Sequence, residues 1–295
     1  MINSEIMLSI LVITYQHKNY IRKCLDSVFM QKTIFNYEVI IADDFSTDGT
    51  REIIKEFKKK YGEKIKLVLQ RKNHGATRNS YYAAKMARGK YVIAVDGDDY
   101  WIDENKLQKQ VDYLENHPER MGVFHKCRYV DENGKILNKR HEDFYPIKNN
   151  YSMRHFEKGI LPGQTSTFMF RNGMVDYKMI PRLHNMVGDQ TLYVALLAQG
   201  DFGFIDEIMS MYTKVCKSNA TNACSIAKFN NYTDVMWMYY YNLEKYIRNT
   251  YKQNINLKYL RVDQTQTAWN KLKEDISITN LKIYFRILLY SYIHK

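Results

Sequence analysis

The first hundred residues alternate short apolar runs with segments whose apolar residues recur at helical spacing. Four runs have the length and composition of buried strands: Leu8–Ile13, Glu38–Ala42, Ile65–Leu69 and Tyr91–Val95. The segments between them predict three helices: Ile21–Phe29, Ile53–Tyr61 and Ala76–Arg88, the last ended by Gly89. Strands that alternate with helices predict an α/β fold with a mainly parallel sheet and right-handed crossovers.

Carboxylates follow two of these strands. The fourth strand ends in Asp96, Asp98 and Asp99, and the second ends in the acidic turn 43–50. Ligands of α/β proteins gather beyond the carboxyl ends of the strands, and oxygen ligands suit Mg²⁺ or Mn²⁺. An EF-hand is excluded because Trp101 stands at the sixth loop position and Leu107 at the twelfth. The pair of turns favours a platform for a metal and a diphosphate, with a solvated acidic turn as the alternative.

The charge balance points to anionic partners. With 44 Lys and Arg against 32 Asp and Glu, the net charge is +12, which fits nucleic acid, nucleotide-sugars or an acidic membrane surface. The chain lacks the glycine-rich phosphate loops of other nucleotide binders, so basic side chains such as Arg71 and Arg78 must help to neutralise phosphate. Scattered basic residues and carboxylate-tipped strands argue against nucleic acid. A metal-dependent nucleotidyltransferase remains the enzyme alternative.

Four motifs occur in an order that resembles glycosyltransferase family 2, the inverting sugar-nucleotide enzymes with the GT-A fold. They are residues 14–16, 43–50, 73–79 and 96–101, and the resemblance covers roughly the first two-thirds of the chain. It implies that Asp44 contacts the nucleobase and that Tyr15 stacks on it. It also implies that Asp98 contacts the ribose or the metal, Mn²⁺ or Mg²⁺, and that Asp99 contacts the metal or the diphosphate. The full set of nucleotide-binding residues that it implies is Thr14, Tyr15, Asp44, Arg71, Gly75, Arg78, Asp96 and Asp98.

The acceptor half is expected at about residues 105–224. A helix is predicted over Asn105–Asn116 and a strand over Thr165–Arg171, and the acceptor-binding residues are expected to be Gly163, Gln164 and Trp101. By resemblance, Asp189 is the catalytic base, with a helix N-cap as the alternative role. After the Met209–Tyr212 strand the family often has Arg and then His, whereas this chain has Thr213 and Lys214. An additional metal-binding His is therefore not expected.

The resemblance implies transfer of a sugar from a nucleoside diphosphate sugar, by the family's habit a UDP-sugar. The acceptor is expected to be a hydroxyl of a saccharide or a lipid-linked glycan, as in the synthesis of surface polysaccharides. The transferase is expected to be of the hexosyl or N-acetylhexosaminyl type. A carboxylate takes the proton of the acceptor hydroxyl while the metal stabilises the departing nucleoside diphosphate.

The composition changes near residue 225. The predicted domains are therefore residues 1–224, with a nucleotide half at about 1–104, and a basic aromatic helical extension over 225–295. The extension carries 11 Lys and Arg against 5 Asp and Glu, and thus +6 of the total charge. It fits peripheral contact with an anionic membrane, and the alternative is packing on the catalytic domain or on a second copy of the chain.

Localisation is expected to be cytoplasmic, at the inner face of the membrane if the extension binds lipid. The four cysteines, Cys24, Cys127, Cys216 and Cys224, have no metal-binding spacing and fit reduced thiols. The apolar run Ile6–Ile13 is too short to span a bilayer and is expected to be a strand rather than a signal peptide.

Overall fold

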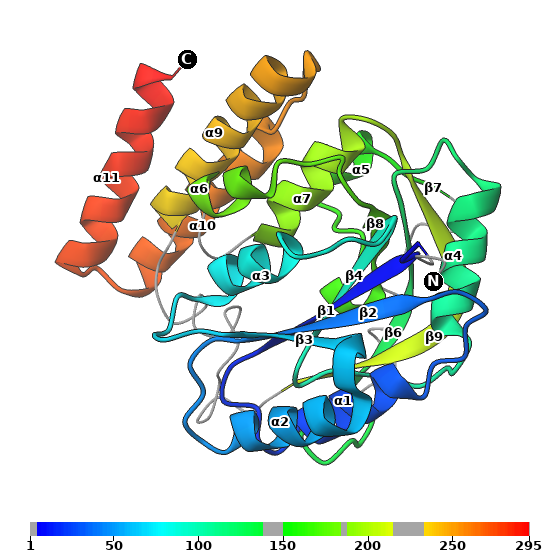
Figure 1. The fold of residues 1–295 in the computed structure, drawn as a ribbon. Coiled ribbons are helices and arrows are strands. Elements are labelled where there is room, and N and C mark those ends of the chain that lie inside the picture. The colour runs from blue at the N-terminus through cyan, green and yellow to red at the C-terminus, as the bar shows by residue number, and fades with distance from the viewer. Residues whose placement is uncertain (1–4, 138–149, 184–187, 215–232, 295) are drawn as a thin grey trace. The chain divides into compact units, whose positions relative to one another are not determined.

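The computed structural model describes residues 5–137, 150–183, 188–214 and 233–294 (Figure 1). They divide into two compact units, the first formed by residues 1–151 with 162–221 and the second by residues 152–161 with 222–295. The predicted boundary at residue 224 falls outside the described ranges and stays a prediction. Cys24 and Cys127 are buried free thiols, whereas Cys216 and Cys224 lie outside those ranges.

Nine strands of the described chain form one sheet in the first unit. They are β1 (Leu8–Thr14), β2 (Tyr37–Asp43), β3 (Ile65–Leu69), β4 (Tyr91–Asp96), β5 (Tyr100–Trp101), β6 (Gly122–Val130), β7 (Asn150–Tyr151), β8 (Met169–Arg171) and β9 (Phe202–Thr213). Their order is β3-β2-β1-β4-β8-β6-β9-β5, with β7 also paired to β9. The first four strands are parallel, which confirms the predicted α/β fold, and β8 runs antiparallel to both β4 and β6.

Helices cover this sheet on both faces, with α1 and α2 below it and α3, α6 and α7 above it in Figure 1. The helices of the first unit are α1 (Ile21–Phe29), α2 (Thr50–Tyr61), α3 (Ala76–Ala84), α4 (Lys106–Asn116), α6 (Ile180–Leu183) and α7 (Gly188–Leu197), and the short 3-10 turns are η1 (Gly62–Lys64), η3 (Thr165–Thr167) and η4 (Tyr177–Met179). Because both faces are covered, every residue of β1 and β2 is buried.

Two predicted elements differ from the observed ones. The helix α3 ends at Ala84 rather than Arg88, since the backbone N–H and the guanidinium of Arg88 both donate to the buried carboxylate of Glu38. The predicted strand Thr165–Arg171 is a 3-10 turn followed by the short strand β8. In each case contacts with a distant part of the chain override the local preference.

The register of the parallel strands brings the predicted site together. Thr14 pairs with Asp43 across β1 and β2, and Ile13 pairs with Asp96 across β1 and β4. The carboxyl ends of β1, β2 and β4 are therefore adjacent. The two acidic turns follow from this edge, as the sequence predicted.

The second unit is helical, as predicted for the C-terminal extension. Its helices are α5 (Met153–Glu157), α9 (Thr233–Tyr251), α10 (Lys258–Glu274) and α11 (Ile278–Ile293). Its core is formed by Trp237, Ala268, Ile283 and Ile287. Among the described helices, none combines the length and apolar character needed to cross a membrane.

Candidate active site

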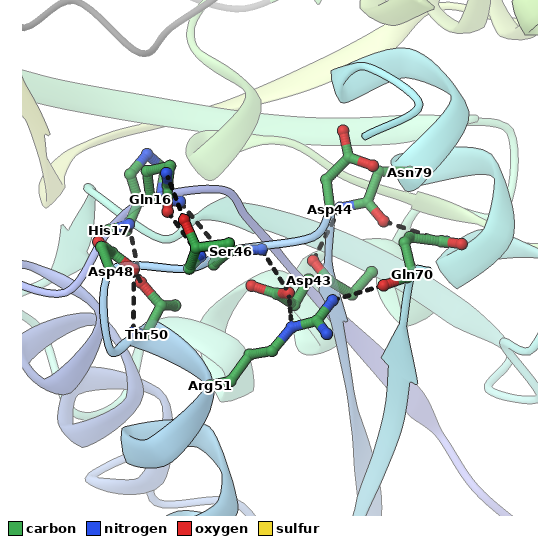
Figure 2. A network of polar contacts seen from close by, with 12 residues as sticks. Gln16, His17, Asp43, Asp44, Ser46, Asp48, Thr50, Arg51, Gln70 and Asn79 are labelled. Carbon is green, nitrogen blue, oxygen red and sulfur yellow. Dashed lines mark hydrogen bonds and ion pairs between the residues drawn. The ribbon is translucent and has the colours of Figure 1, made fainter. Parts of the chain in front are cut away.

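The loop after β1 is bound to the loop after β2, and Figure 2 shows Gln16 and His17 against Ser46, Asp48 and Thr50. The backbone N–H of Gln16 donates to Ser46 Oγ at 2.8 Å, and the N–H of His17 donates to Thr50 Oγ1 at 3.0 Å. Gln16 has φ of 58°, in the left-handed region that non-glycine residues rarely adopt. Hydrogen bonds between the two loops hold this conformation.

Asp43 and Asp44 have different partners, although they are consecutive. Asp43 is buried, and its Oδ2 accepts from Arg51 Nε at 2.5 Å, whereas its Oδ1 has no hydrogen-bond partner in the described part of the chain. The carboxylate of Asp44 accepts from the N–H groups of His74 at 2.8 Å and Gly75 at 2.7 Å. Asp44, the predicted base reader, therefore also fixes the loop before α3. The sequence did not reveal this second role.

The acidic turn after β4 is a cluster of buried or half-buried carboxylates. Burial, together with the negative charges of Asp98 and Asp189, raises the pKa of Asp96 to about 7. Burial also raises the pKa of Asp99 well above its usual value, with a further contribution from the neighbouring Asp98 and Asp96, although the N–H of Thr213 donates to it at 2.9 Å. Within the described residues, the one basic side chain within ion-pair distance of Asp98 is His17, whose Nε2 lies 3.8 Å from Asp98 Oδ2.

Gly97 allows the acidic turn to approach the end of β1. A Cβ atom at this position would lie 2.7 Å from Thr14 Oγ1 and 2.8 Å from His17 Nδ1, which is closer than real contacts allow. The glycine therefore brings Thr14 and His17 against the acidic turn. Neither Gly97 nor His17 was predicted as a functional residue, and the only signal in the sequence is their position within or beside the two motifs.

Asp189 lies in the first turn of α7, as predicted. It retains partial exposure, yet the surrounding protein raises its pKa by burial, and the N–H groups of Gln190 and Asp189 offset part of this effect. Asp189 is close enough to Asp96 to raise the pKa of that residue, so the first unit brings the predicted base to the acidic turn. A carboxyl group with a raised pKa is suited to accept a proton.

The position of α7 depends on a close contact with α3. A Cβ at Gly188 would lie 2.7 Å from Thr77 Cγ2 and 3.0 Å from Ile180 Cγ2. The absence of a side chain at Gly188 therefore lets the start of α7 lie directly against Thr77 of α3. This contact fixes Asp189 relative to the loop that Asp44 holds.

The predicted acceptor residues are only partly placed where expected. Gly163 and Gln164 are half-buried, and Gln164 Nε2 donates to the hydroxyl of Tyr129 at 2.8 Å. Trp101, however, is 1% exposed, and its Nε1 donates to the carbonyl of Ser166 at 3.1 Å. Direct contact between Trp101 and an acceptor is at odds with this burial. The ring instead packs in the interior of the first unit, with the Nζ atom of the buried Lys106 4.1 Å from its centroid.

The remaining predicted nucleotide residues lie around the same edge. Thr14 is buried, Tyr15 and Gly75 are half-buried, and Arg71 and Arg78 are exposed. The two arginines are therefore accessible to an anionic ligand. None of these positions by itself establishes contact with a nucleotide, so their roles stay predictions.

The carboxylates of the acidic turn fit a divalent cation that takes some of its ligands from the protein and the others from a substrate. Across the described ranges no group of three or more His, Cys, Asp or Glu is arranged to hold a metal ion. Asp98 and Asp99 are nevertheless adjacent carboxylates that repel their neighbours, and Mg²⁺ is commonly held by one or two carboxylates together with substrate phosphates. The residues thus fit a shared site and do not form an all-protein cage.

Solved structures define the class of fold. TarS from S. aureus, residues 1–349, matches with a TM-score of 0.69 at 17% identity over 96% of this chain and 79% of that chain. Its complex with UDP-GlcNAc matches with a TM-score of 0.67 at 17% identity, over 96% of this chain and 80% of that one. A mannosyltransferase of Pyrobaculum calidifontis, PcManGT, in complex with GDP-Man and Mn²⁺, matches with a TM-score of 0.53 at 15% identity over 99% and 89% of the two chains. The fold is GT-A.

The sequence comparison gives the family. The profile of Glycosyl transferase family 2 matches residues 9–179, and the chain belongs to this family. The uncharacterized protein Rv1520 of Mycobacterium tuberculosis is 35% identical over 214 residues, which is 70% of this chain and 58% of that protein. The putative teichuronic acid biosynthesis glycosyltransferase TuaG of Bacillus subtilis is 36% identical over 114 residues, 39% of this chain and 44% of TuaG. The chain thus spans about half the length of these relatives.

Proposed function

We propose that this glycosyltransferase moves a sugar from a UDP-sugar to a hydroxyl group of a saccharide or lipid-linked glycan, with inversion at the anomeric carbon. The observation that carries the proposal is the proximity of Asp189 to the acidic turn, which raises the pKa of Asp96. A base and a diphosphate platform at one strand edge are what single-step displacement requires. TarS complexes with UDP-GlcNAc and UDP support a uridine donor and an N-acetylhexosaminyl group.

In this mechanism the acceptor oxygen attacks the anomeric carbon as the bond from that carbon to the diphosphate oxygen breaks. Asp189 takes the proton of the acceptor hydroxyl, and the N–H groups at the start of α7 stabilise its charged form before that step. Asp98 and Asp99 would hold Mn²⁺ or Mg²⁺, which when bound neutralises charge on the departing diphosphate. Asp44 keeps the loop before α3 in place, and Arg71 and Arg78 contribute positive charge at the same edge.

Calorimetry tests the donor and the metal together. We expect UDP to bind in the presence of Mn²⁺ and to bind much more weakly in excess EDTA. Equal affinity for UDP in EDTA would show that binding needs no metal. Tighter binding of GDP than of UDP would point to a GDP-sugar as the donor, since the fold also occurs in a GDP-Man complex. If neither nucleotide binds, the proposed activity is wrong.

The products distinguish this function from nucleotidyl transfer. A glycosyltransferase releases a nucleoside diphosphate, whereas a nucleotidyltransferase releases pyrophosphate. Release of UDP from a UDP-sugar in the presence of bacterial surface polysaccharide is the expected result. The name of TuaG supports a polysaccharide of this kind as the acceptor.

We further propose that α11 brings a cytoplasmic enzyme to an anionic membrane surface. The helix buries Ile283 and Ile287 in the core of the second unit, yet Phe285 is 63% exposed and Leu289 54% exposed. A shallow groove of about 370 Å³ follows this outer face, and Lys282 lies beside it. Apolar residues flanked by lysine suit the interface of an anionic bilayer.

Vesicle sedimentation tests the contact with lipid. Phe285→Ser with Leu289→Ser should reduce binding to phosphatidylglycerol vesicles, and neutral vesicles should bind the unchanged protein less. Lys55→Gln with Lys59→Gln, on the exposed face of α2, is the control for charge alone. If the unchanged protein does not bind anionic vesicles but dimerises through α11, a second copy of the chain covers this face and the membrane proposal is wrong.

A further inference from the structure

A basic pocket lies in the first unit, where α3 packs against η4 and α6. It has a volume of about 370 Å³ and is lined by Arg78 and Tyr81 of α3, Lys178 of η4, and Pro181 and Arg182 of α6. In Figure 1, α3 and α6 lie beside each other above the sheet. Pockets of this size hold small ligands or one part of a larger ligand.

Within the described residues, no carboxylate neutralises the three cations of this pocket. In the ranges that the structure describes, Arg78, Lys178 and Arg182 form no ion pair, and Arg182 Nη1 lies 3.9 Å from Met179 Sδ. The nearby Asp176 accepts from the backbone N–H of Lys178 at 3.0 Å, as the cap of η4. Like charges around one hollow repel one another, and an anion in the hollow removes that repulsion.

The position of the pocket relates it to the predicted base. Thr77 and Ile180 both contact the start of α7 at Gly188, where an added Cβ would lie within 3.0 Å of each. Arg78 follows Thr77 in the chain and Pro181 follows Ile180. Two residues that line the pocket are therefore adjacent in sequence to the residues that contact Gly188. Asp189 follows Gly188. The pocket thus lies next to the start of α7. This is the end of the helix that carries the proposed base, which the acceptor hydroxyl must approach.

We infer that this pocket binds an anionic group of the acceptor, a phosphate or a carboxylate carried by the growing glycan. The inference rests on the proposed function, because it assigns the acceptor side of that reaction. Lys178 and Arg182 would pair with the anion, and Tyr81 offers an apolar wall with one hydroxyl group for the adjoining sugar. The donor diphosphate is the other source of the same chemistry, since Arg78 was predicted to contact the nucleotide.

The experiment occupies the donor site first. Fluorescein-labelled oligo(glycerol phosphate) and oligoglucuronate, each of six units, are titrated with the protein in saturating UDP and Mn²⁺, and anisotropy is measured. We expect Lys178→Gln with Arg182→Gln to weaken binding of at least one probe by about 25-fold, from about fivefold for each exposed cation removed. Lys55→Gln with Lys59→Gln removes the same charge from α2 and should leave the affinity within about twofold.

Separate outcomes overturn the inference and the proposed function. Equal weakening in the α2 control means that the probes sense net charge only, and the pocket is not an acceptor site. A parallel loss of UDP affinity in the pocket variant assigns the pocket to the donor diphosphate and also overturns the inference. If the unchanged protein binds UDP but neither probe, the inference fails while the proposed function stands. If it does not bind UDP at all, the proposed function itself fails.

Discussion

The carboxylate cluster after β4 should make the ligand-free protein less stable as pH rises. Asp96 has a pKa of about 7 in the folded protein against 3.8 for an ordinary Asp, so the folded state holds its proton longer than the unfolded state. A group of this kind stabilises the fold at low pH, and that contribution is lost as pH rises through the folded pKa. The expected window of loss is therefore about pH 4 to 7.

The size of the effect follows from the two pKa values. The difference between about 7 and 3.8 corresponds to about 4 kcal/mol over the whole window, of which about 3 kcal/mol falls between pH 5 and pH 8. Asp96 keeps partial contact with solvent, which screens its charge, so we expect about 1–2 kcal/mol. Asp96→Asn removes this ionisation and should flatten the pH dependence by a similar amount.

The assay is urea denaturation at pH 5 and pH 8 in EDTA, followed by circular dichroism. The compared quantity is the change in the free energy of unfolding between the two pH values, because any constant cost of the substitution cancels. Asp26→Asn, on the solvent-exposed side of α1, is the control. A stability of the unchanged protein that rises between pH 5 and pH 8, or an Asp96→Asn variant with the same pH dependence, would refute the electrostatic argument.

Three further predictions concern α7 and the metal. Asp189→Asn keeps the shape of the side chain and one acceptor oxygen but removes the base, so transfer should fall by about 10²–10⁴-fold while UDP affinity is retained. A near-normal rate would exclude Asp189 as the base. Asp99→Asn should instead weaken Mn²⁺-dependent UDP binding, and calorimetry that finds unchanged affinity would contradict a metal role. Gly188→Ala should cost about 1–3 kcal/mol in urea denaturation, and Thr77→Ser in the same chain should recover part of it by removing Cγ2. Absence of any recovery would mean that this contact does not set the position of α7.

The sequence predicted the parallel half of the sheet well because its signal is local. The apolar runs of β1, β2 and β4 are nearly continuous, and helix α1 buries four residues that recur at helical spacing, Ile21, Cys24, Leu25 and Val28. The direction of β8 could not be predicted, since it depends on pairing with β4 and β6, far away in the chain. The same limit applies to the end of α3, which depends on Glu38 in β2.

The site was predicted by residue type but not by partner. The motifs identified the acidic turns, yet Asp44 bonds the loop before α3, and Asp43 leaves one buried oxygen without a partner in the described chain. Trp101 was predicted to be an acceptor-binding residue, and its burial beside Lys106 is at odds with direct contact. Lys178 and Arg182 had no motif at all, because only the folded chain brings α6 to α3.

The bonds of Asp44 to the loop before α3, and the contact of Thr77 with Gly188, have a consequence for motion. Together they link the end of β2 to the start of α7 through the loop before α3 and the first residues of that short helix. We therefore expect the end of β2 and the start of α7 to move together. The spacing between the loop that Asp44 holds and the start of α7 is therefore set by the folded chain before any ligand binds, so closing motions can change access to the site but not the distance between these two segments.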